Sequence, residues 1–378
     1  QSELKYQSFL EIALWYNRYG LVDEAMQVLD QSPDHPLILV WSAYLDRAHT
    51  DRSSSIVKNL LEASAEFVFP YRPETLEPLD WLNSETSHWK AKYYLGLNYW
   101  ALNNTDKASK YFKDCKNDSD IPSFYIARSQ LSELVNGKES FNDLEYALNL
   151  DKTQWRSWNH LIEAYLTHGV YDKAVSNGKA AVKRFPENYE LKLKLVEAYL
   201  FTGAHHSAVN LLDKTHVLPF EGASKGRQLY EQSLLFSALE SYESKKYNQA
   251  IQFLEKAREW PEHLGVGKPY DPDNRMEDYL QAMCLKKLNK NSSEYETQVV
   301  NYTTEHFQGR YRDILGLLLM EPGRAEELMA QATVDNKKAA QWIQAAYQND
   351  TSKVSDLAKT FEGDLYFDIV ERLVELSR

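Results

Sequence analysis

Residues 155–219 decide the fold, and they read WRSWNHLIEAYLTHGVYDKAVSNGKAAVKRFPENYELKLKLVEAYLFTGAHHSAVNLLDKTHVLP. The stretch contains two copies of one pattern, offset by 34 residues from Ala174 to Ala208. The other recurring positions are Leu161 and Ile162 as Leu195 and Val196, Tyr165 as Tyr199, Gly169 as Gly203, Ala181 as Thr215, and Pro186 as Pro219. A period of this length predicts a helical repeat in which each copy is a pair of helices.

Each repeated position has a packing reason. Large apolar residues fill the inner face of the first helix, the glycine permits the turn at its C-terminal end, and the alanine lets the second helix approach closely. This is the tetratricopeptide pattern. We therefore predict an all-α fold, an α-α right-handed superhelix of the tetratricopeptide-like solenoid type with two irregular insertions.

Composition and charge exclude several classes of partner. The chain has 378 residues and a net charge of −12, whereas non-specific binding of nucleic acid or of an anionic membrane needs a basic face. No run approaches the ~18 apolar residues of a membrane span. Cys115 and Cys284 lie in helical apolar patterns, so we interpret both as small core residues.

The N-terminus leaves the compartment open. The chain begins at Gln1 rather than Met and shows no charged leader followed by an apolar region. We therefore expect a cut or processed start, so the lack of a signal says nothing about the parent gene product. A cytoplasmic location is favoured, and a periplasmic one is the alternative.

We divide the chain into five parts. They are N-terminal helical repeats (1–66), an irregular insertion rich in proline and aromatic residues (67–90), a core tetratricopeptide-like array (91–261), a Gly/Pro loop (262–274), and divergent C-terminal helical repeats with a cap (275–378). The three prolines of residues 67–89 exclude one long helix there, although a short helix from Glu74 to Leu82 fits.

A closer resemblance rests on strings that lie mostly in the insertions. They are FVFPYRPET (67–75), WKAKYYLGLNYW (89–100), LPFEGASKGRQLYEQ (218–232) and REWPEHLGVGKPYDPDNRMEDYL (258–280). Over about residues 60–290 the chain resembles the C-terminal half of an uncharacterised bacterial family, in which a β-rich domain of unknown function precedes a long tetratricopeptide array. The resemblance implies that the chain is a fragment, and that the missing domain is similar to the β-sandwiches of carbohydrate-active proteins. This last step is an analogy between folds.

The search for catalytic motifs gives little. Residues Gly222 to Gly226 (GASKG) match the nucleophile-elbow expression around Ser224, but that elbow needs a buried strand before it. GVGK (265–268) is too short for a phosphate-binding loop. We predict that the chain is not an enzyme and needs no cofactor.

Metal-binding patterns are also weak. His205 and His206 are adjacent, so on a helix they point about 100° apart and cannot chelate one ion. An acidic cluster suggests calcium but lacks the glycine of a calcium loop, and we interpret it as solvated loop and helix N-terminal charge. Its members are Asp271, Asp273, Glu277 and Asp278.

The two insertions supply the candidate binding residues, because they combine aromatic with charged side chains in long loops. The candidates are Tyr71, Arg72 and Trp81 in the first insertion, and His263, Lys268, Tyr270 and Arg275 in and beside the second. A loop that only plugs the solenoid is equally consistent with these sequences. We expect both insertions to be ordered, at least one against the concave face, with Arg72 or Arg275 paired to a carboxylate.

Two functions from different classes fit these features. The first is a non-catalytic scaffold whose concave face binds a protein or peptide partner, or the chain's own missing N-terminal domain. The second is an accessory domain of a carbohydrate-active enzyme, in which the insertions contact a glycan or the missing catalytic domain. The second function requires the aromatics of 67–89 and 262–275 to converge on one open pocket with two carboxylates.

Overall fold

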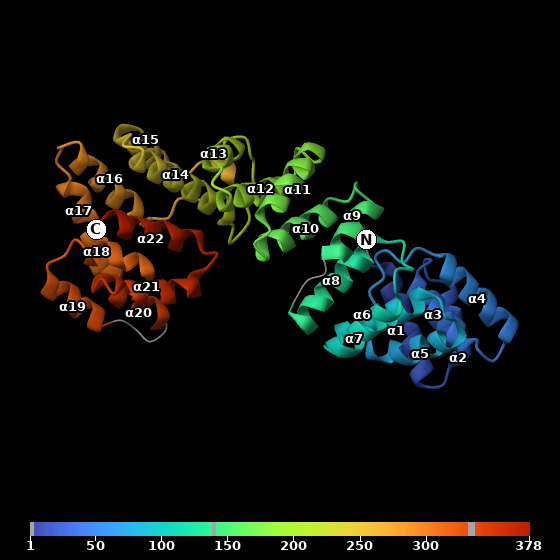
Figure 1. Ribbon diagram of the computed structural model, residues 1–378. Coiled ribbons are helices and arrows are strands. Elements are labelled where there is room, and N and C mark those ends of the chain that lie inside the picture. The colour runs from blue at the N-terminus through green and yellow to red at the C-terminus, as the bar shows by residue number, and fades with distance from the viewer. Residues whose placement is uncertain (1–3, 138–140, 332–336) are drawn as a thin grey trace. The chain divides into compact units, whose positions relative to one another are not determined.

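The computed structural model describes residues 4–137, 141–331 and 337–378, and over these ranges the chain forms helices without a β-strand. Contacts divide the chain into two compact units, Gln1–Ala164 and Tyr165–Arg378 (Figure 1). The all-α helical-repeat fold predicted from the sequence is confirmed. We describe each unit by itself.

The elements follow the chain as consecutive helices. In the first unit they are α1 (Lys5–Arg18), α2 (Val22–Asp30), α3 (Pro36–Leu45), α4 (Thr50–Glu62), η1 (Pro73–Thr75), α5 (Leu76–Glu85), α6 (Trp89–Ala101), α7 (Thr105–Asp114), α8 (Pro122–Asn136) and α9 (Phe141–Leu150). Helix α10 (Trp155–Thr167) contains the boundary. In the second unit they are α11 (Tyr171–Arg184), α12 (Tyr189–Phe201), α13 (His205–Leu212), α14 (Lys225–Glu243), α15 (Tyr247–Ala257), η2 (Glu262–Leu264), α16 (Arg275–Lys287), α17 (Ser293–His306), η3 (Tyr311–Asp313), α18 (Ile314–Leu317), α19 (Pro322–Ala330), α20 (Lys337–Tyr347), α21 (Thr351–Ala358), η5 (Lys359–Phe361) and α22 (Leu365–Leu376).

The repeat at residues 155–219 has the predicted period. Helices α10 and α12 begin 34 residues apart, and so do α11 and α13. Gly169 and Gly203 end the first helix of each copy with φ of 70° and 72°, a left-handed conformation that glycine adopts without steric cost. Ala174 and Ala208 are fully buried, as close approach of the second helix requires.

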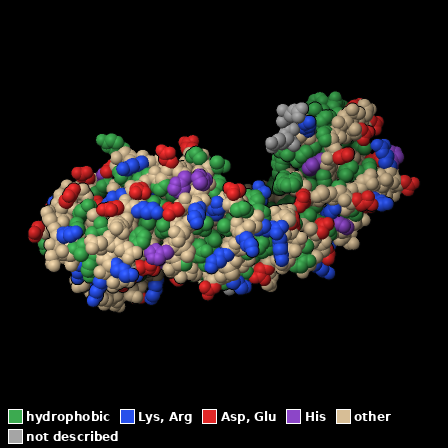
Figure 2. Space-filling view, turned by 90° about the horizontal axis from the view of Figure 1, so that it is seen from above, with side chains coloured by type: hydrophobic (Ala, Val, Ile, Leu, Met, Phe, Trp, Pro, Cys, Tyr) green, Lys and Arg blue, Asp and Glu red, His purple; other side chains and the backbone are tan. Residues whose placement is uncertain are grey.

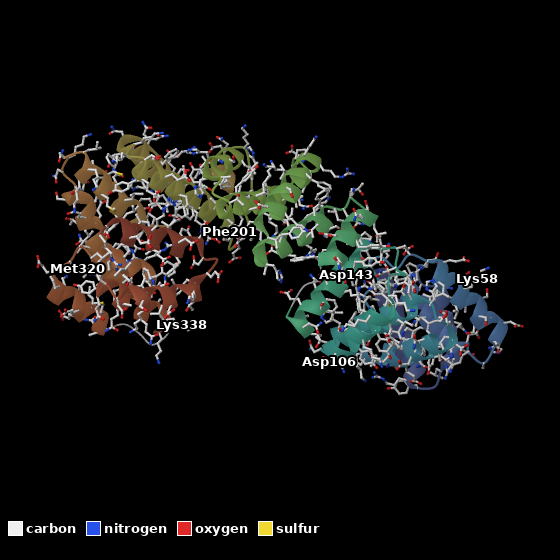
Figure 3. The ribbon with its side chains drawn as sticks, viewed as in Figure 1. Lys58, Asp106, Asp143, Phe201, Met320 and Lys338 are labelled. Carbon is white, nitrogen blue, oxygen red and sulfur yellow. The ribbon has the colours of Figure 1, made fainter. Side chains whose placement is uncertain are left out.

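The first unit has an aromatic core between its hairpins. The ring of Phe112 on α7 stacks on Phe124 of α8 with centroids 5.4 Å apart, and Tyr93 of α6 meets its edge at the same distance. Arg128 on α8 donates from Nε and Nη2 to the carboxylate of Asp143 on α9. Figure 3 labels Asp143 on this helix. Such bidentate pairs add orientation to apolar packing, and here one fixes α9 on α8.

The first insertion is built into this core. The short helix expected from Glu74 to Leu82 is present as η1 followed by α5, which packs on α3 and α6 and buries Leu79 and Leu82 completely. The end of the insertion is attached to the end of α4 through Lys90. Its Nζ donates to the carbonyl oxygens of Leu61 and Ala63 at 2.6 and 2.5 Å. Burial lowers the pKa of Lys90.

The second unit is organised around the long helix α14. Most of its residues are buried, and Leu234 and Leu239 belong to an apolar cluster that extends to α22. Three buried serines, Ser233, Ser237 and Ser241, each donate a hydroxyl hydrogen to the carbonyl four residues earlier, at 2.6 to 2.8 Å. Their polar atoms are therefore satisfied within α14 itself.

The two cysteines are core residues, as the sequence predicted. Cys115 and Cys284 are fully buried. Burial raises the pKa of each thiol to about 12, so both are neutral and unreactive under ordinary conditions.

Candidate functional site

The first insertion runs along α1 as an extended segment before η1. The guanidinium of Arg72 pairs with Glu11, and Glu74 lies 3.5 Å from Arg18, so two ion pairs join the segment to α1. Asn98 of α6 donates its side-chain amide to the carbonyl of Arg72 at 3.0 Å. The segment is ordered, and Arg72 is paired with a carboxylate as expected.

Exposed aromatic rings lie beside these ion pairs. On α1, Trp15 shares the face of Glu11 and Arg18, because residues four and three apart in a helix are neighbours. Trp15 is 54% exposed and Tyr19 is 66% exposed, and their ring centroids are 5.1 Å apart. Large rings of this kind are usually buried at least in part, so this exposure is informative.

The extended segment adds two more rings. Phe69 and Tyr71 are 58% and 45% exposed, whereas Val68 and Pro70 between and before them are buried. Alternate residues of extended backbone point to the same side, which places both rings outward. We call Trp15, Tyr19, Phe69 and Tyr71 the aromatic surface.

The third candidate of this insertion, Trp81, lies elsewhere. Its ring packs edge-on against Tyr44, with centroids 5.9 Å apart, and it lines a separate pocket of about 470 Å³ between α4 and α5. That pocket also includes Lys58 and His88. Trp81 therefore does not join Tyr71 and Arg72 in one site.

The second insertion belongs to the second unit and is anchored by its backbone. Val217 donates its N–H to the carbonyl of His263 at 2.8 Å, and the His263 ring lies 3.3 Å from the carbonyl of Leu212. Lys268 is exposed and Tyr270 is fully exposed, and among the described residues no other large hydrophobic side chain is as exposed as Tyr270. These three candidates lie around one loop.

Arg275 has the opposite environment. Only 4% of the residue is exposed, and it binds Asp273 and Asp313 at 2.8 and 2.6 Å. Although burial opposes ionisation of Asp273, the hydrogen bond and charge of Arg275 lower the pKa of that carboxyl. The expected pairing is present for Arg275 as well as for Arg72.

The prediction that the acidic cluster is solvated is wrong for two of its members. Glu277 is fully buried, and Asp278 is 8% exposed. Asp278 accepts from Arg258 at 2.7 Å, and Arg258 also donates to Gln281 at the same distance. The error arose because the N-terminal turn of α16 is packed on all sides, which periodicity does not reveal.

The sequence also failed to identify a second, partly buried acid that faces Glu277. Glu231 of α14 interacts with Glu277 of α16 and accepts a hydrogen bond from the hydroxyl of Tyr366 on α22. Arg227, stacked over Trp260 at 4.4 Å, lies 3.7 Å from Glu231. We call Glu231 and Glu277 the acid pair. Glu231 lies in the string 218–232, and Glu277 lies in the string 258–280. Both strings support the family resemblance, and nothing else in the sequence indicates that the two acids meet.

The remaining motifs have ordinary environments. Ser224 is exposed in the loop before α14. His205 stacks on Phe236 with centroids 4.7 Å apart and lies 2.7 Å from Glu240, while burial lowers its pKa. In the described ranges, no three His, Cys, Asp or Glu side chains are grouped so that they could hold a metal ion.

Surface charge and hydropathy add two facts. Acidic and basic side chains are interspersed over the face shown in Figure 2, and the chain as a whole is acidic. In the part of the chain that the structure describes, every helix is too short or too polar to span a membrane.

The aromatics of the two insertions do not meet in one pocket within either unit. A polar pocket of about 510 Å³ beside α16 and α17 does contain Asp271 and Asp278, but its rings are Tyr295 and Tyr302 of α17. Tyr270 does not line it. The glycan-binding alternative therefore gains no support.

Comparison with known proteins gives low similarity. No family model and no curated relative matches the sequence. Among solved structures, a tetratricopeptide repeat protein from Parabacteroides merdae is 14% identical over 74% of this chain and 99% of that one, with a TM-score of 0.32. The C-terminal part of a repeat protein from Cytophaga hutchinsonii is 12% identical over 65% and 93%, with a TM-score of 0.37. Yeast Tom70 is 14% identical over 95% and 92%, with a TM-score of 0.34. Similarity at this level says nothing about function.

Proposed function

We propose that this chain is a non-catalytic binding module and that the aromatic surface of its first unit binds an extended segment of a protein partner. The observation that carries the proposal is the exposure of four large rings on ordered backbone. Large exposed apolar patches on a soluble protein mark interaction sites. Tyr and Trp also supply large contact area with few rotatable bonds.

The ion pairs on either side support a preformed site. Arg72 with Glu11, and Arg18 with Glu74, fix the extended segment on α1 before any partner arrives. Preorganisation lowers the entropy that binding must overcome. The segment contacts α1 and α6, which are the first helices of their hairpins, and first helices form the ligand-binding side of a helical-repeat array.

The ring geometry favours a peptide over a sugar. The planes of Trp15 and Tyr19 are inclined at 60°, so together they form a notched surface. A notched surface accepts the interdigitating side chains of a peptide, whereas a sugar ring stacks on a flat one. Apolar anchors of the partner would contact the rings, while its polar groups would contact the ion pairs at the margin.

The test is a selection from a displayed library of random peptides, followed by affinity measurement on single variants. Trp15→Ala and Tyr71→Ala should each weaken enriched peptides at least tenfold, the usual effect of losing an aromatic anchor. Tyr270→Ala is the matched control, since it removes an exposed tyrosine from the second unit. Enriched peptides that bind both first-unit variants as tightly as the wild type would refute the proposal.

A further inference from the structure

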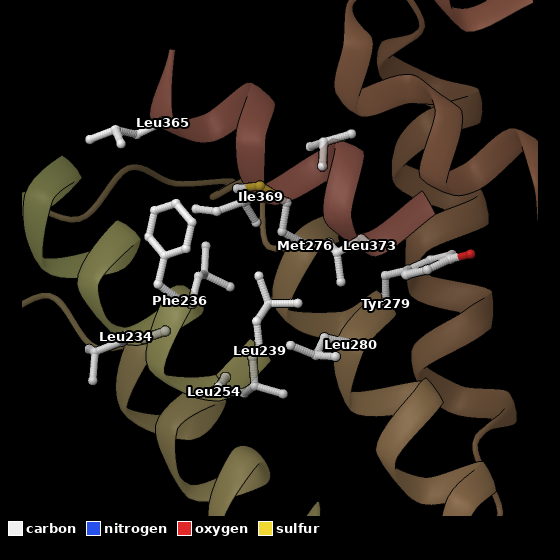
Figure 4. Packing of buried hydrophobic residues seen from close by; sticks show 14 of the residues in the cluster. Leu234, Phe236, Leu239, Leu254, Met276, Tyr279, Leu280, Leu365, Ile369 and Leu373 are labelled. Carbon is white, nitrogen blue, oxygen red and sulfur yellow. The ribbon is translucent and has the colours of Figure 1, made fainter. Parts of the chain in front are cut away.

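The C-terminal helix α22 lies on a surface made by α14 and α16. These two helices are the first members of the consecutive hairpins α14/α15 and α16/α17, and α22 contacts both. Leu365, Ile369 and Leu373 recur every four residues and form the buried face of α22. Figure 4 shows Ile369 beside Phe236 of α14 and Met276 of α16, with Leu365 and Leu373 on either side along α22, and all belong to one apolar cluster. The surface is thus a helix-binding one, occupied by a segment of the same chain.

The acid pair lies at the polar margin of this contact. Tyr366 of α22 donates to Glu231 of α14, while Glu277 of α16 faces Glu231. Glu277 is fully buried, and its carboxyl group interacts with Glu231 and with its own backbone, while no cation lies within salt-bridge distance of it among the described residues. Three helices therefore meet at two adjacent carboxyl groups.

The surrounding cations have other partners. Arg258, after α15, is bound by Asp278 and Gln281. Arg312 of η3 lies over the Tyr366 ring at 4.1 Å and 3.7 Å from Asp273.

Arg227 of α14 donates to the carbonyl of Ala257 at 2.7 Å and lies 3.7 Å from Glu231. No arginine thus forms a salt bridge with Glu277 within the described residues. An ionised Glu277 would be a buried charge without a counter-ion, which is strongly disfavoured.

These observations fix the protonation of the closed form. Burial first, and the neighbouring Glu231 second, raise the pKa of Glu277 well above its ordinary range, while a backbone hydrogen bond and Arg258 oppose the shift. Burial also raises the pKa of Tyr366, so its hydroxyl stays a donor. The closed arrangement therefore has a neutral Glu277 beside the Glu231 that Tyr366 contacts.

We propose that α22 is a latch on the surface of α14 and α16, closed while Glu277 carries a proton and released when that proton passes to solvent water. Loss of the proton leaves the buried carboxylate of Glu277 beside the partly buried carboxylate of Glu231. Water can hydrate them only if α22, which bears Tyr366, moves away. Release uncovers the apolar surface of α14 and α16 for an amphipathic helix of another protein.

The direction of the pH dependence follows from linkage. In the closed form Glu277 holds its proton up to a higher pH than in the open form. The proton therefore favours closure, and the closing equilibrium is strongest below the ordinary glutamate pKa, 4.5. As pH rises from there toward the raised pKa of the closed form, the closing equilibrium weakens by up to tenfold per pH unit. Other groups that titrate identically in both forms do not contribute.

Hydrogen exchange of residues 365–376 tests the latch in the whole chain. As the pH rises above the ordinary glutamate pKa, 4.5, and after correction for intrinsic rates, α22 of the wild type should lose protection by up to tenfold per pH unit, while α12 of the same unit stays protected. Glu277→Gln replaces the neutral acid with a neutral amide and should abolish the slope. Glu294→Gln, which changes an exposed glutamate on α17, should leave it intact.

Three outcomes would overturn the proposal. The first is an α22 whose corrected protection does not change with pH in the wild type. The second is an unaltered slope in Glu277→Gln. The third is an equal loss in α12, which would show that the proton acts on the stability of the whole unit. The first and third need only the wild type, so a poorly folding variant does not block the test.

Discussion

The two insertions differ in where they place their charged side chains. In the first, aromatic rings such as Phe69 and Tyr71 face solvent and the ion pair of Arg72 lies at the surface. In the second, the charged Arg275 is buried between two aspartates, and the ring of Tyr270 is fully exposed at the loop tip. The comparison teaches that a loop rich in aromatics and charge can be a surface or a core element, and that burial of the charges decides which.

The largest effect should come from breaking the buried network of the second insertion. Arg275→Ala removes the buried cation between Asp273 and Asp313 and leaves the fully buried Asp313 without a counter-ion, which costs about 3–5 kcal/mol of unfolding free energy. Urea denaturation measures the loss, and hydrogen exchange assigns it to the second unit. Lys359→Ala removes an exposed pair with Asp356 and should change almost nothing. A loss below 1 kcal/mol for Arg275→Ala would contradict the buried network.

A smaller effect should come from the backbone of the same insertion. Gly265 has φ of 71°, and a Cβ there would lie 2.8 Å from the carbonyl oxygen of Val217. Gly265→Ala should therefore cost roughly 2–4 kcal/mol, from strain and from the forced separation of the two loops. Gly267→Ala is the control, since a Cβ there meets open space. Equal denaturation midpoints for the two variants would show that the loops are not held together at this point.

The first insertion should respond more weakly. Arg72 keeps 20% of its side chain exposed and its partner Glu11 keeps 58%, so solvent screens the pair. We expect Arg72→Ala to cost about 1 kcal/mol, near the upper end for surface pairs. A double-mutant cycle with Glu11→Ala isolates the pair from other contacts of Arg72. A coupling energy above ~2 kcal/mol would make this insertion resemble the second one.

The smallest effect belongs to Tyr270. Because its side chain is fully exposed, Tyr270→Ala should change the unfolding free energy by less than about 0.5 kcal/mol. Thermal denaturation beside the wild type is sufficient to check this. A clear destabilisation would mean that the ring packs on the protein in solution, and the contrast between loop tip and buried base would fail.

The sequence was informative where structure depends on neighbours in the chain. The period from Ala174 to Ala208 predicted helical pairs, and the glycines at 169 and 203 marked their turns, because helix packing and turn geometry impose local requirements. Prolines in residues 67–89 correctly limited the helix there to a short α5. Tyr71 and Arg72 were named together, and the structure places both beside α1.

Contacts between distant elements escaped prediction. Glu231 and Tyr366 are 135 residues apart and meet only because α22 returns to α14. Neither residue has an unusual local sequence. A glutamate or a tyrosine on an amphipathic helix is ordinarily predicted to lie on its solvated face, so the pattern does not indicate a contact. Burial of Glu277 has the same origin, because helices α14, α15, α17, α18 and α22 all pack on α16, and no pattern within α16 records their presence.

The serines of α14 have a mechanical consequence. At its N-terminal end this helix is fastened to its surroundings by directional bonds, through Arg227 and Glu231. Further along, Ser233, Ser237 and Ser241 donate their hydroxyl hydrogens to the backbone of α14 itself. Neighbouring helices therefore pack against this stripe without hydrogen bonds to its hydroxyl groups. The directional bonds of the C-terminal half of α14 come from its acidic residues instead, because Glu240 lies 2.7 Å from His205 and Glu243 accepts from Arg372 of α22 at 2.7 Å. The serine stripe therefore gives α14 a surface that neighbours contact by shape alone, while charged side chains fix the position of the helix at both of its ends.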